Sequence, residues 1–501
     1  TAQAGGSIGG LMAAAVIFTL PGLILTNPDQ VSLLWLTLLA GSSAALGIGL
    51  SIPLREEYVI RQNLSFPAGR AGGEIIKAGF EGDQRFKYII IFGTAAALFT
   101  LVRDALGFDF VTLGTVAGMP VLILIMPMVI ATGLILGPAN SLSWGAGGAL
   151  SLIGLFIIPG LVPEFAENSN LILQNVGMGL VIGSGIGYIL FHSRLKAGFR
   201  GIWLQQQPWT WGLALINFII LTLAGVPVWA AALGLALTFI AVNLASRMTG
   251  VTNIDPLEQF GLLATLLIVF IFGIFNLNIS LESRYLLTFS IAMATAIAGD
   301  IGHDYRSAEI VGTDYRKIVR IDMIAAIAVS LAVPLMVVVL QSAEIADHLF
   351  TTKFPAPQAQ IVMNNLMGLA HPYLFIAGLI LALIIEGLRF KNRLPYLHLM
   401  PFGIGLFLGI NLALLIAIGG LLAIRVNRKG PAATLTGIVI AAAILGGEGT
   451  IGFIQAVSNV FFPGQKVMLL GGLGLILLAV LTRSLQTFFN RGDEERGTSD
   501  K

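Results

Sequence analysis

Long apolar runs dominate the pattern of hydrophobic and polar positions along this chain of 501 residues. A helix needs about 20 mostly apolar residues to cross the hydrocarbon core of a bilayer. The pattern therefore predicts an all-α fold, a polytopic transmembrane helical bundle with roughly 14 to 16 spanning segments. The runs lie near 8–25, 31–54, 88–106, 119–137, 143–160, 173–192, 208–225, 227–247, 258–278, 285–302, 318–341, 372–388, 432–455 and 467–488.

One further stretch, 396–425, is longer than a single span and rich in glycine. We expect either two short helices or one broken helix there. Glycine is frequent throughout, with 60 residues, and small residues let helices approach closely in lipid.

The composition agrees with a lipid environment. Hydrophobic residues make up 56% of the chain and charged residues 11%, whereas soluble domains carry about 25% charged residues. The net charge of +2 gives no reason to expect nucleic acid as a partner. Because the chain has no cysteine, disulfides, thiolate catalysis and cysteine-ligated metals are excluded.

Basic residues gather in a few loops, and their distribution predicts the orientation in the cell membrane. Together with Arg247, these loops hold 24 of the 28 Lys and Arg residues. The positive-inside rule makes them cytoplasmic, places the loops 160–172 and 343–370 outside, and places the C-terminus inside. The clusters are 55–87, 194–200, 306–320, 389–393, 425–429 and the C-terminal end.

Three regions follow from these segments. We expect an N-terminal transmembrane half over 1–200, a C-terminal half over 201–490 and a disordered cytoplasmic tail over 491–501. The chain begins at Thr1 without a Met and without the basic segment of a signal peptide, so we expect upstream sequence to be missing.

An internal repeat links the two halves, as is common in transporters. Gly133-Leu-Ile-Leu-Gly137 precedes Gly147-Gly148, and Gly405-Leu-Phe-Leu-Gly409 precedes Gly419-Gly420 at the same spacing. The loop assignment sends the run 143–160 outward and 411–425 inward. Either one span is miscounted or the repeats are imperfectly matched.

Glu448 is the sharpest candidate for a functional residue, because a charge inside a span is costly to bury. It lies in Gly446-Gly-Glu-Gly449, in the middle of an apolar run. The flanking glycines would let the helix unwind or a substrate approach the backbone. The alternative is a structural Glu that caps a neighbouring helix.

A second candidate is the sequence Gly299-Asp-Ile-Gly-His-Asp-Tyr-Arg306. Asp300 and Asp304 are four residues apart and share a face if the helix continues. His303 could titrate near neutral pH. The group has too few ligands for a metal site, and the alternative is a helix end that meets a wet loop.

A third candidate is the stretch 64–79, where Pro67 can open a helix and small residues expose its first N–H groups. Such an end favours an anionic partner, for example a substrate carboxylate. The alternative is an interfacial helix with a solvated Glu74. Glu309 repeats this feature in Ser307-Ala-Glu-Ile310, which favours a function.

Other polar residues have simpler explanations. Glu386 with Arg389, and Arg103 with Asp104, are expected to form ion pairs. We expect hydrogen bonds between helices from three asparagines inside spans, namely Asn217, Asn243 and Asn411.

Enzyme and ATPase signatures are absent from the sequence. There is no His-Glu-x-x-His sequence and no Walker motif. No cofactor is predicted, and a gradient-driven carrier is the simplest account.

The same residues give a resemblance to a known family. Five stretches in order resemble motifs of the oligopeptide transporter family, especially its prokaryotic members, and of the related yellow-stripe-like metal-chelate transporters. They are Asn63–Glu74, Ser246–Pro256, Gly299–Gly312, Phe354–Ala359 and Gly446–Gly449. The resemblance implies proton-coupled transport of small peptides or metal chelates, and a segment of about two more spans before Thr1.

Two motifs differ from the family pattern. The usual Glu-Thr-Asp reads Val251-Thr-Asn253 here, which removes two carboxylates, and Gln-Asp-Leu-Lys reads His303-Asp-Tyr-Arg306. These differences point to an atypical cargo.

The sequence thus predicts a symporter in contact with membrane lipid, a peptide or chelate substrate and protons; association with further copies of the chain is left open. The alternative is a structural or assembly subunit of a larger membrane complex. We expect substrate or coupling contacts from Glu448, Asp300, Asp304, His303, Glu74, Asp255 and Glu309, and backbone contacts at Gly69, Gly72, Gly73, Gly250, Gly447 and Gly449.

Overall fold

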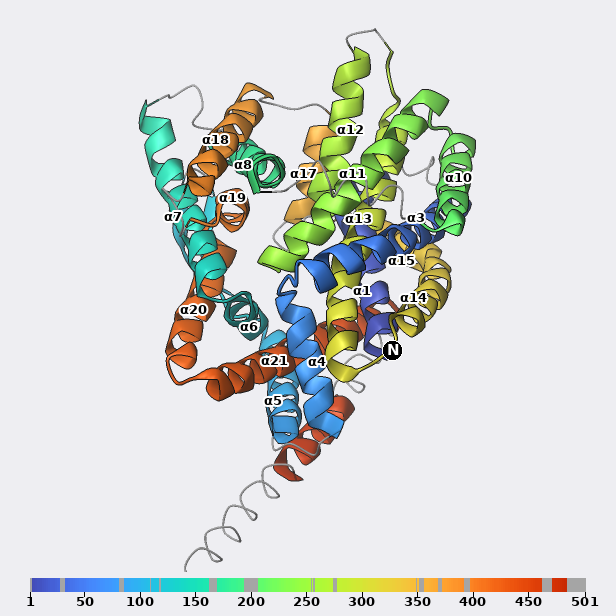
Figure 1. Cartoon of the computed structure of the whole chain (residues 1–501). Helices are drawn as coiled ribbons and strands as arrows, with labels where there is room; N and C mark the ends of the chain where they lie inside the picture. The colour runs from blue at the N-terminus through green and yellow to red at the C-terminus, as the bar shows by residue number, and fades with distance from the viewer. Residues whose placement is uncertain are drawn as a thin grey trace, which may run out of the picture. The chain divides into compact units, whose positions relative to one another are not determined.

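The computed structural model consists almost entirely of helices (Figure 1). Eleven of the described helices are long and apolar enough to cross a membrane, and five shorter apolar helices have 10–17 residues. The predicted all-α, polytopic architecture is confirmed. The structure describes residues 2–27, 32–80, 85–108, 110–116, 119–161, 169–192, 206–253, 255, 257–273, 277–347, 349–350, 356–367, 372–391, 397–461 and 471–483.

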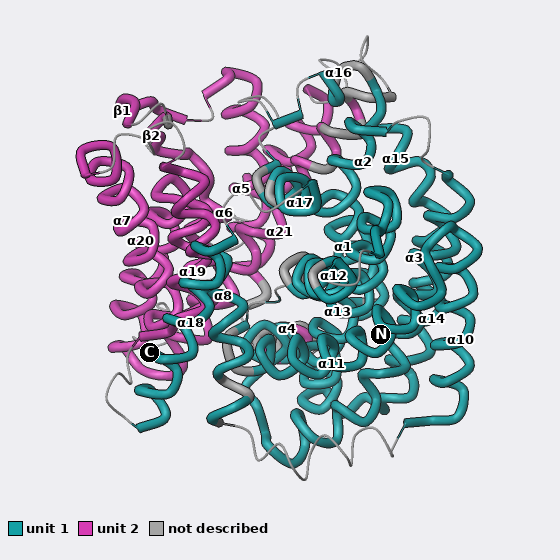
Figure 2. The backbone as a smooth tube through the Cα atoms, turned by 90° about the horizontal axis from the view of Figure 1, so that it is seen from above, with its two compact units in different colours: residues 1–73, 178–394 teal, residues 74–177, 395–501 magenta. Residues whose placement is uncertain are grey.

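The chain forms two compact units (Figure 2), Thr1–Gly73 with Met178–Leu394, and Glu74–Gly177 with Pro395–Lys501. Each unit therefore takes helices from both halves of the sequence. The predicted halves 1–200 and 201–490 describe the order of segments along the chain and not compact units, so they stay a prediction. The predicted tail 491–501 lies outside the described residues.

The first unit is built around α13 (Leu281–Val311), which is buried along most of its length. Ser280 caps its N-terminus by accepting a hydrogen bond from the Ser283 N–H, and Gly312 ends it with a φ of 75°. The other helices of the unit are α1 (Ala2–Thr19), α2 (Pro21–Thr26), α3 (Leu33–Leu54), η2 (Arg55–Arg61, π-helical), α10 (Pro208–Leu223), α11 (Val228–Thr252), α12 (Leu257–Gly273), α14 (Tyr315–Ser330), α15 (Val333–Gln341), α16 (Ala343–Ala346), α17 (Pro357–Met367) and α18 (Pro372–Phe390).

Two helices, α4 (Pro67–Phe80) and α8 (Ser169–His192), run from one unit into the other. The second unit contains α5 (Arg85–Leu106), β1 (Phe110–Val116), β2 (Met119–Leu124), α6 (Pro127–Leu136), α7 (Pro138–Leu161), α19 (Leu399–Leu408), α20 (Ile410–Asn427) and α21 (Pro431–Phe461).

The predicted break in 396–425 is present and has a counterpart in the first repeat. Gly409 separates α19 from α20 with a φ of 78°, and Gly137 separates α6 from α7 with a φ of 81°. Such backbone conformations are open to glycine and strained for other residues. Both breaks fall on the last glycine of the repeated Gly-x-x-x-Gly sequence.

The two broken helices of the second unit pack against each other in opposite directions. Ser141 lies against Gly420, whereas Gly148, further along α7, lies against the earlier residue Ala413. The helices α7 and α20 are therefore antiparallel. The two repeats therefore match each other but have inverted orientations. This inversion explains why the sequence predicted opposite directions for 143–160 and 411–425, without a miscounted span or an imperfect match.

The apolar run 119–137 is not the single span that its length predicted. Its first part is strand β2, which pairs antiparallel with β1, and its second part is the short helix α6. Pro120 and Pro127 cannot donate the hydrogen bonds of a helix interior, which explains the division. The run 318–341, by contrast, lies in one apolar segment, Tyr315–Gln341, which is long enough to span and is interrupted between α14 and α15, near Pro334.

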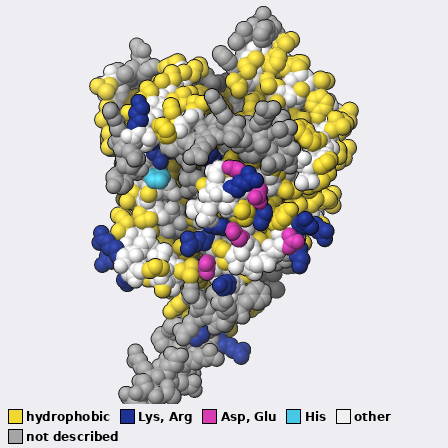
Figure 3. Space-filling view, viewed as in Figure 1, with side chains coloured by type: hydrophobic (Ala, Val, Ile, Leu, Met, Phe, Trp, Pro, Cys, Tyr) yellow, Lys and Arg dark blue, Asp and Glu magenta, His cyan; other side chains and the backbone are white. Residues whose placement is uncertain are grey.

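Apolar side chains gather along the right side of the view in Figure 3, over helices such as α10 and α14. Helix α10 exposes apolar residues such as Trp211 and Leu215, and α14 exposes Ile324 and Ile327. A lipid surrounding explains such a surface, because in water it would be costly.

Candidate functional site

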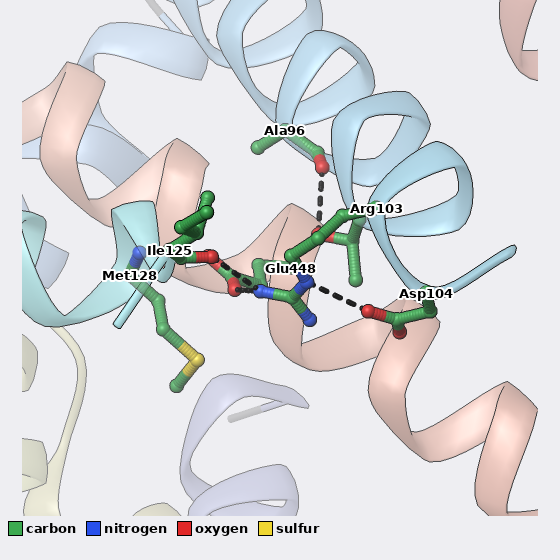
Figure 4. A network of polar contacts seen from close by, with 7 residues as sticks. Ala96, Arg103, Asp104, Ile125, Met128 and Glu448 are labelled. Atoms are coloured by element: carbon green, nitrogen blue, oxygen red, sulfur yellow. Dashed lines mark hydrogen bonds and ion pairs between the residues drawn. The ribbon is translucent and has the colours of Figure 1, made fainter. Parts of the chain in front are cut away.

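Glu448 lies in α21 and is only 3% exposed. Figure 4 shows its carboxylate facing Arg103 of α5 and the start of α6. The Arg103 Nη1 donates to Oε1 at 2.5 Å, and the Met128 backbone N–H donates to Oε2 at 2.7 Å. Both carboxylate oxygens are therefore satisfied within the second unit.

Arg103 joins this carboxylate to two further groups. Its Nε donates to Asp104 Oδ1 at 2.7 Å, and its Nη1 also donates to the Ile125 carbonyl at 3.0 Å. The expected pair with Asp104 is present, but it belongs to a larger network. Arg103 thereby ties α5 to α21 and to the segment before α6.

Helix α6 explains why a carboxylate is placed here. Its N-cap residue, Met126, offers no side-chain hydrogen bond, and the first backbone N–H groups of any helix lack partners within the helix. Glu448 supplies an acceptor at this positive helix end. The geometry is that of the alternative explanation, a Glu that caps a neighbouring helix; a part in coupling stays a prediction.

The two glycines beside Glu448 have different surroundings. A Cβ on Gly447 would collide with the Gly93 carbonyl, so this glycine allows α21 and α5 to touch. Gly449 has open space where a Cβ would be.

In the first unit, the structure brings three of the family-like stretches together at the start of α4. The Phe66 N–H donates to the Gly250 carbonyl at 3.0 Å, and the Ala68 N–H donates to Asn253 Oδ1 at 2.7 Å. The fully buried Phe66 ring meets the edge of His303 at 5.5 Å between centroids. The stretches 63–74, 246–256 and 299–312 therefore form one junction.

The start of α4 is already hydrogen-bonded in this conformation. Helix α4 begins at Pro67, as predicted. Its Ala68 N–H is bound by Asn253, and its Gly69 N–H donates to Nδ1 of His303 at 3.2 Å. A substrate carboxylate would have to replace these side chains.

The predicted backbone-contact glycines at this junction divide into packed and open positions. A Cβ on Gly69 would collide with the His303 carbonyl, a Cβ on Gly250 would lie 2.8 Å from the Phe66 ring, and one on Gly73 would lie 3.0 Å from Ile310. Gly72 is open, with its nearest neighbour 3.9 Å away.

Asp300 and Asp304 lie on one continuous helix, as the sequence predicted. Asp304 is 1% exposed and accepts hydrogen bonds from Gln3 Nε2 and Ser7 Oγ, both at 2.8 Å. Asp300 is half-buried, one turn earlier. Helix α1 therefore supplies neutral donors to a buried carboxylate.

Asp255 joins the same region from the segment after α11. Its carboxylate lies against Gly299, where an added Cβ would be 2.7 Å from Oδ2. This places Asp255 beside the residue that precedes Asp300.

The remaining two predicted acidic residues are more accessible. Glu309 is exposed and pairs with Arg306 at 2.7 Å, and Arg306 also donates to Asn63 Oδ1 at 2.6 Å. Glu74 is half-buried in α4.

Two further carboxylates are buried, although their burial was not predicted from the sequence. The expected ion pair of Glu386 with Arg389 is present at 2.8 Å, but the Glu386 carboxylate is also fully buried and accepts from Ser184 at 2.9 Å. Asp322 was not singled out, yet it is fully buried in α14. The sequence did carry a signal, because Asp322 lies inside the predicted apolar run 318–341, but it stands only two residues after the basic residue Arg320.

The asparagines follow the expectation in two of three cases. Asn217 donates to the Ser43 hydroxyl at 2.9 Å, and Asn243 accepts from Tyr58 at 2.5 Å, both between helices. Asn411 instead bonds the backbone of strand β2, since its Oδ1 accepts from Leu122 N–H at 2.9 Å.

Many apolar helices, breaks inside some of them and carboxylates buried in apolar helices are typical of polytopic membrane transporters. The chain belongs to the OPT oligopeptide transporter family, whose model matches residues 1–190 and 206–459. This is a family of transporters and not a class of enzymes.

A curated relative is similar over a shorter stretch. It is a Haemophilus influenzae protein described as "Putative oligopeptide transporter", 38% identical over 96 residues. The match covers 19% of this chain and 15% of the relative.

Proposed function

We propose that this protein is a proton-coupled secondary transporter of small peptides or peptide-like metal chelates. The family supports transport of oligopeptides. The single observation that supports coupling is Asp304, a carboxylate buried in a spanning helix and bound by neutral donors from α1. Ionisable groups buried in spanning helices are typical of proton pathways.

The junction around the start of α4 is the proposed substrate site. Asp300 and Asp304 would attract the ammonium group of a peptide, with Asp255 close by. The backbone of 66–74 and 250–256 would hold its carboxylate, in place of Asn253 and His303. Because α4 and α11 meet here, substrate binding would change how the two helices contact each other.

The charge pattern supports a proposal for the orientation of the chain. We propose a multi-pass protein of the cell membrane with a cytoplasmic C-terminus, because the basic loops hold most of the Lys and Arg residues.

Uptake into proteoliposomes tests the coupling. We expect an inwardly directed proton gradient to drive uptake from a panel of radiolabelled short peptides and peptide–metal chelates. Asp304→Asn should reduce this concentrative uptake to the level of vesicles without protein. Asp347→Asn, at an exposed position, is the matched control and should transport like the native chain.

Uptake that ignores the pH gradient would contradict proton coupling. If Glu448→Gln and Asp304→Asn also left uptake unchanged, the proposed coupling residues would be wrong as well.

A further inference from the structure

Asp322 is a buried carboxyl that lies outside the proposed substrate site. It lies in α14, within the apolar segment Tyr315–Gln341, and its exposed fraction is 0%. Neither Oδ1 nor Oδ2 has a hydrogen-bond partner among the residues that the structure describes. It therefore differs from Asp304, Glu386 and Glu448, whose carboxylates all accept hydrogen bonds.

The charged surroundings of Asp322 are mainly acidic. Asp300 and Asp304 of α13 both lie close enough to interact with it electrostatically, and His303 interacts with Asp300. Tyr305 of α13 also interacts with Asp322, but its hydroxyl is hydrogen-bonded with Ser51. Helices α1 and α3, which also pack against α14, contain no ionisable side chain.

Among the described residues, four basic side chains lie on or next to α14, but none of them pairs with Asp322. Arg55 of η2 stacks over the ring of Tyr315 at 4.5 Å. On α14 itself, Arg316, Lys317 and Arg320 are exposed at the start of the helix. None of these four forms an ion pair with Asp322 in the described part of the chain.

An ionised Asp322 would be unfavourable here for two reasons. Removing a carboxylate from water without a hydrogen-bond donor has a large cost in free energy. Two neighbouring carboxylates add repulsion. A bound metal ion does not account for the buried charge, because the described residues contain no group of three or more His, Asp or Glu side chains that could hold one. A proton removes both costs.

We propose that Asp322 is a proton-binding residue of the transport cycle, protonated in the conformation described and ionised when its contact with α1 and α13 opens to water. This inference rests on the proposed proton coupling. It extends the coupling site from α13 to α14, so that protonation of Asp322 stabilises the closed contact between these helices.

Infrared spectroscopy of the purified full-length protein tests the protonation without any substrate. The carbonyl-stretching band of protonated carboxylic acids should be present at neutral pH and lose the intensity of one carboxyl in Asp322→Asn. Asp347→Asn should leave the band unchanged. A band identical in native protein and Asp322→Asn, or one lost only in Asp304→Asn, would overturn the assignment.

Transport measurements then test the role in coupling. In proteoliposomes containing Asp322→Asn, exchange of radiolabelled peptide between the two sides should persist, while uptake driven by a pH gradient should be lost. If Asp322→Asn abolishes exchange too, or if it retains pH-driven uptake, the inference is wrong. If the native chain itself ignores the gradient while the infrared band behaves as expected, the proposed function fails and the protonated carboxyl stands.

Discussion

At the scale of single residues, Glu448 shows how a buried charge can organise its surroundings. Its carboxylate binds a guanidinium from α5 and a backbone N–H of α6, so one side chain connects three helices. Removing one member of a buried ion pair leaves the other without compensation, and that loss is larger than the net value of the pair.

We therefore expect Arg103→Met to lower the free energy of unfolding by about 3 kcal/mol or more, because Glu448 would keep its charge without its cation. The thermal unfolding midpoint of the detergent-solubilised protein measures this. Arg103→Met combined with Glu448→Gln should recover part of the loss.

The exposed pair between Arg306 and Glu309 is the matched control. Glu309→Gln should cost less than about 1 kcal/mol, since solvent screens that pair. If Arg103→Met and Glu309→Gln lower the free energy of unfolding equally, burial does not strengthen the pair between Arg103 and Glu448.

Glu448 could be predicted from the sequence because a charge inside an apolar run is conspicuous. Asp304 was predicted for another reason, since it follows Asp300 by four residues just beyond the run 285–302. Their partners could not be predicted. Arg103 is 345 positions from Glu448, and Gln3 is 301 positions from Asp304. Asp322 was missed since it stands close to basic residues, and its burial depends on how α1 and α13 pack.

At the scale of elements, the two glycine breaks are the most specific feature. Gly137 and Gly409 combine positive φ with ψ values of 168° and −177°. This region of backbone conformation belongs almost exclusively to glycine. Each break lets one apolar stretch form two short helices.

We expect Gly137→Ala and Gly409→Ala each to lower the free energy of unfolding by about 1–3 kcal/mol through backbone strain. Thermal unfolding midpoints in detergent measure both. Gly212→Ala, in the interior of α10 with open space for a Cβ, should instead be neutral or stabilising by up to about 1 kcal/mol. If all three variants unfold alike, strain at the breaks is absent.

Most spanning elements were predictable, because length and hydropathy suffice to place a helix in lipid. The hairpin of β1 and β2 was not, since its second strand is as apolar as a spanning helix and hydropathy does not distinguish the two. Prolines at 120 and 127 carried the missing signal. The glycine-rich stretch 396–425 was read correctly as broken because its length exceeded one span.

At the scale of the whole molecule, orientation in the membrane is the main prediction that remains. The absence of cysteine makes it easy to test, because any introduced cysteine is a unique label. Asp347 in the loop expected outside and Lys429 in the loop expected inside are both exposed.

We expect a membrane-impermeant maleimide to label Asp347→Cys in intact cells and Lys429→Cys only after the membrane is opened, as the distribution of basic residues requires. Labelling is read by mass shift on a gel. The reverse pattern would show that the predicted orientation is wrong. Labelling of both cysteines in intact cells would contradict the prediction that positions 347 and 429 lie on opposite sides of the membrane.

The reciprocal glycine contacts of the second unit also have a mechanical consequence. Gly133 and Gly419 bring α6 and α20 together backbone to backbone, and Gly147 and Gly405 do the same for α7 and α19. Helices that interlock in this way cannot slide along each other without first separating. We therefore expect these four helices to move as one rigid body during transport, so that the motion which exposes a bound substrate takes place at other, looser helix contacts.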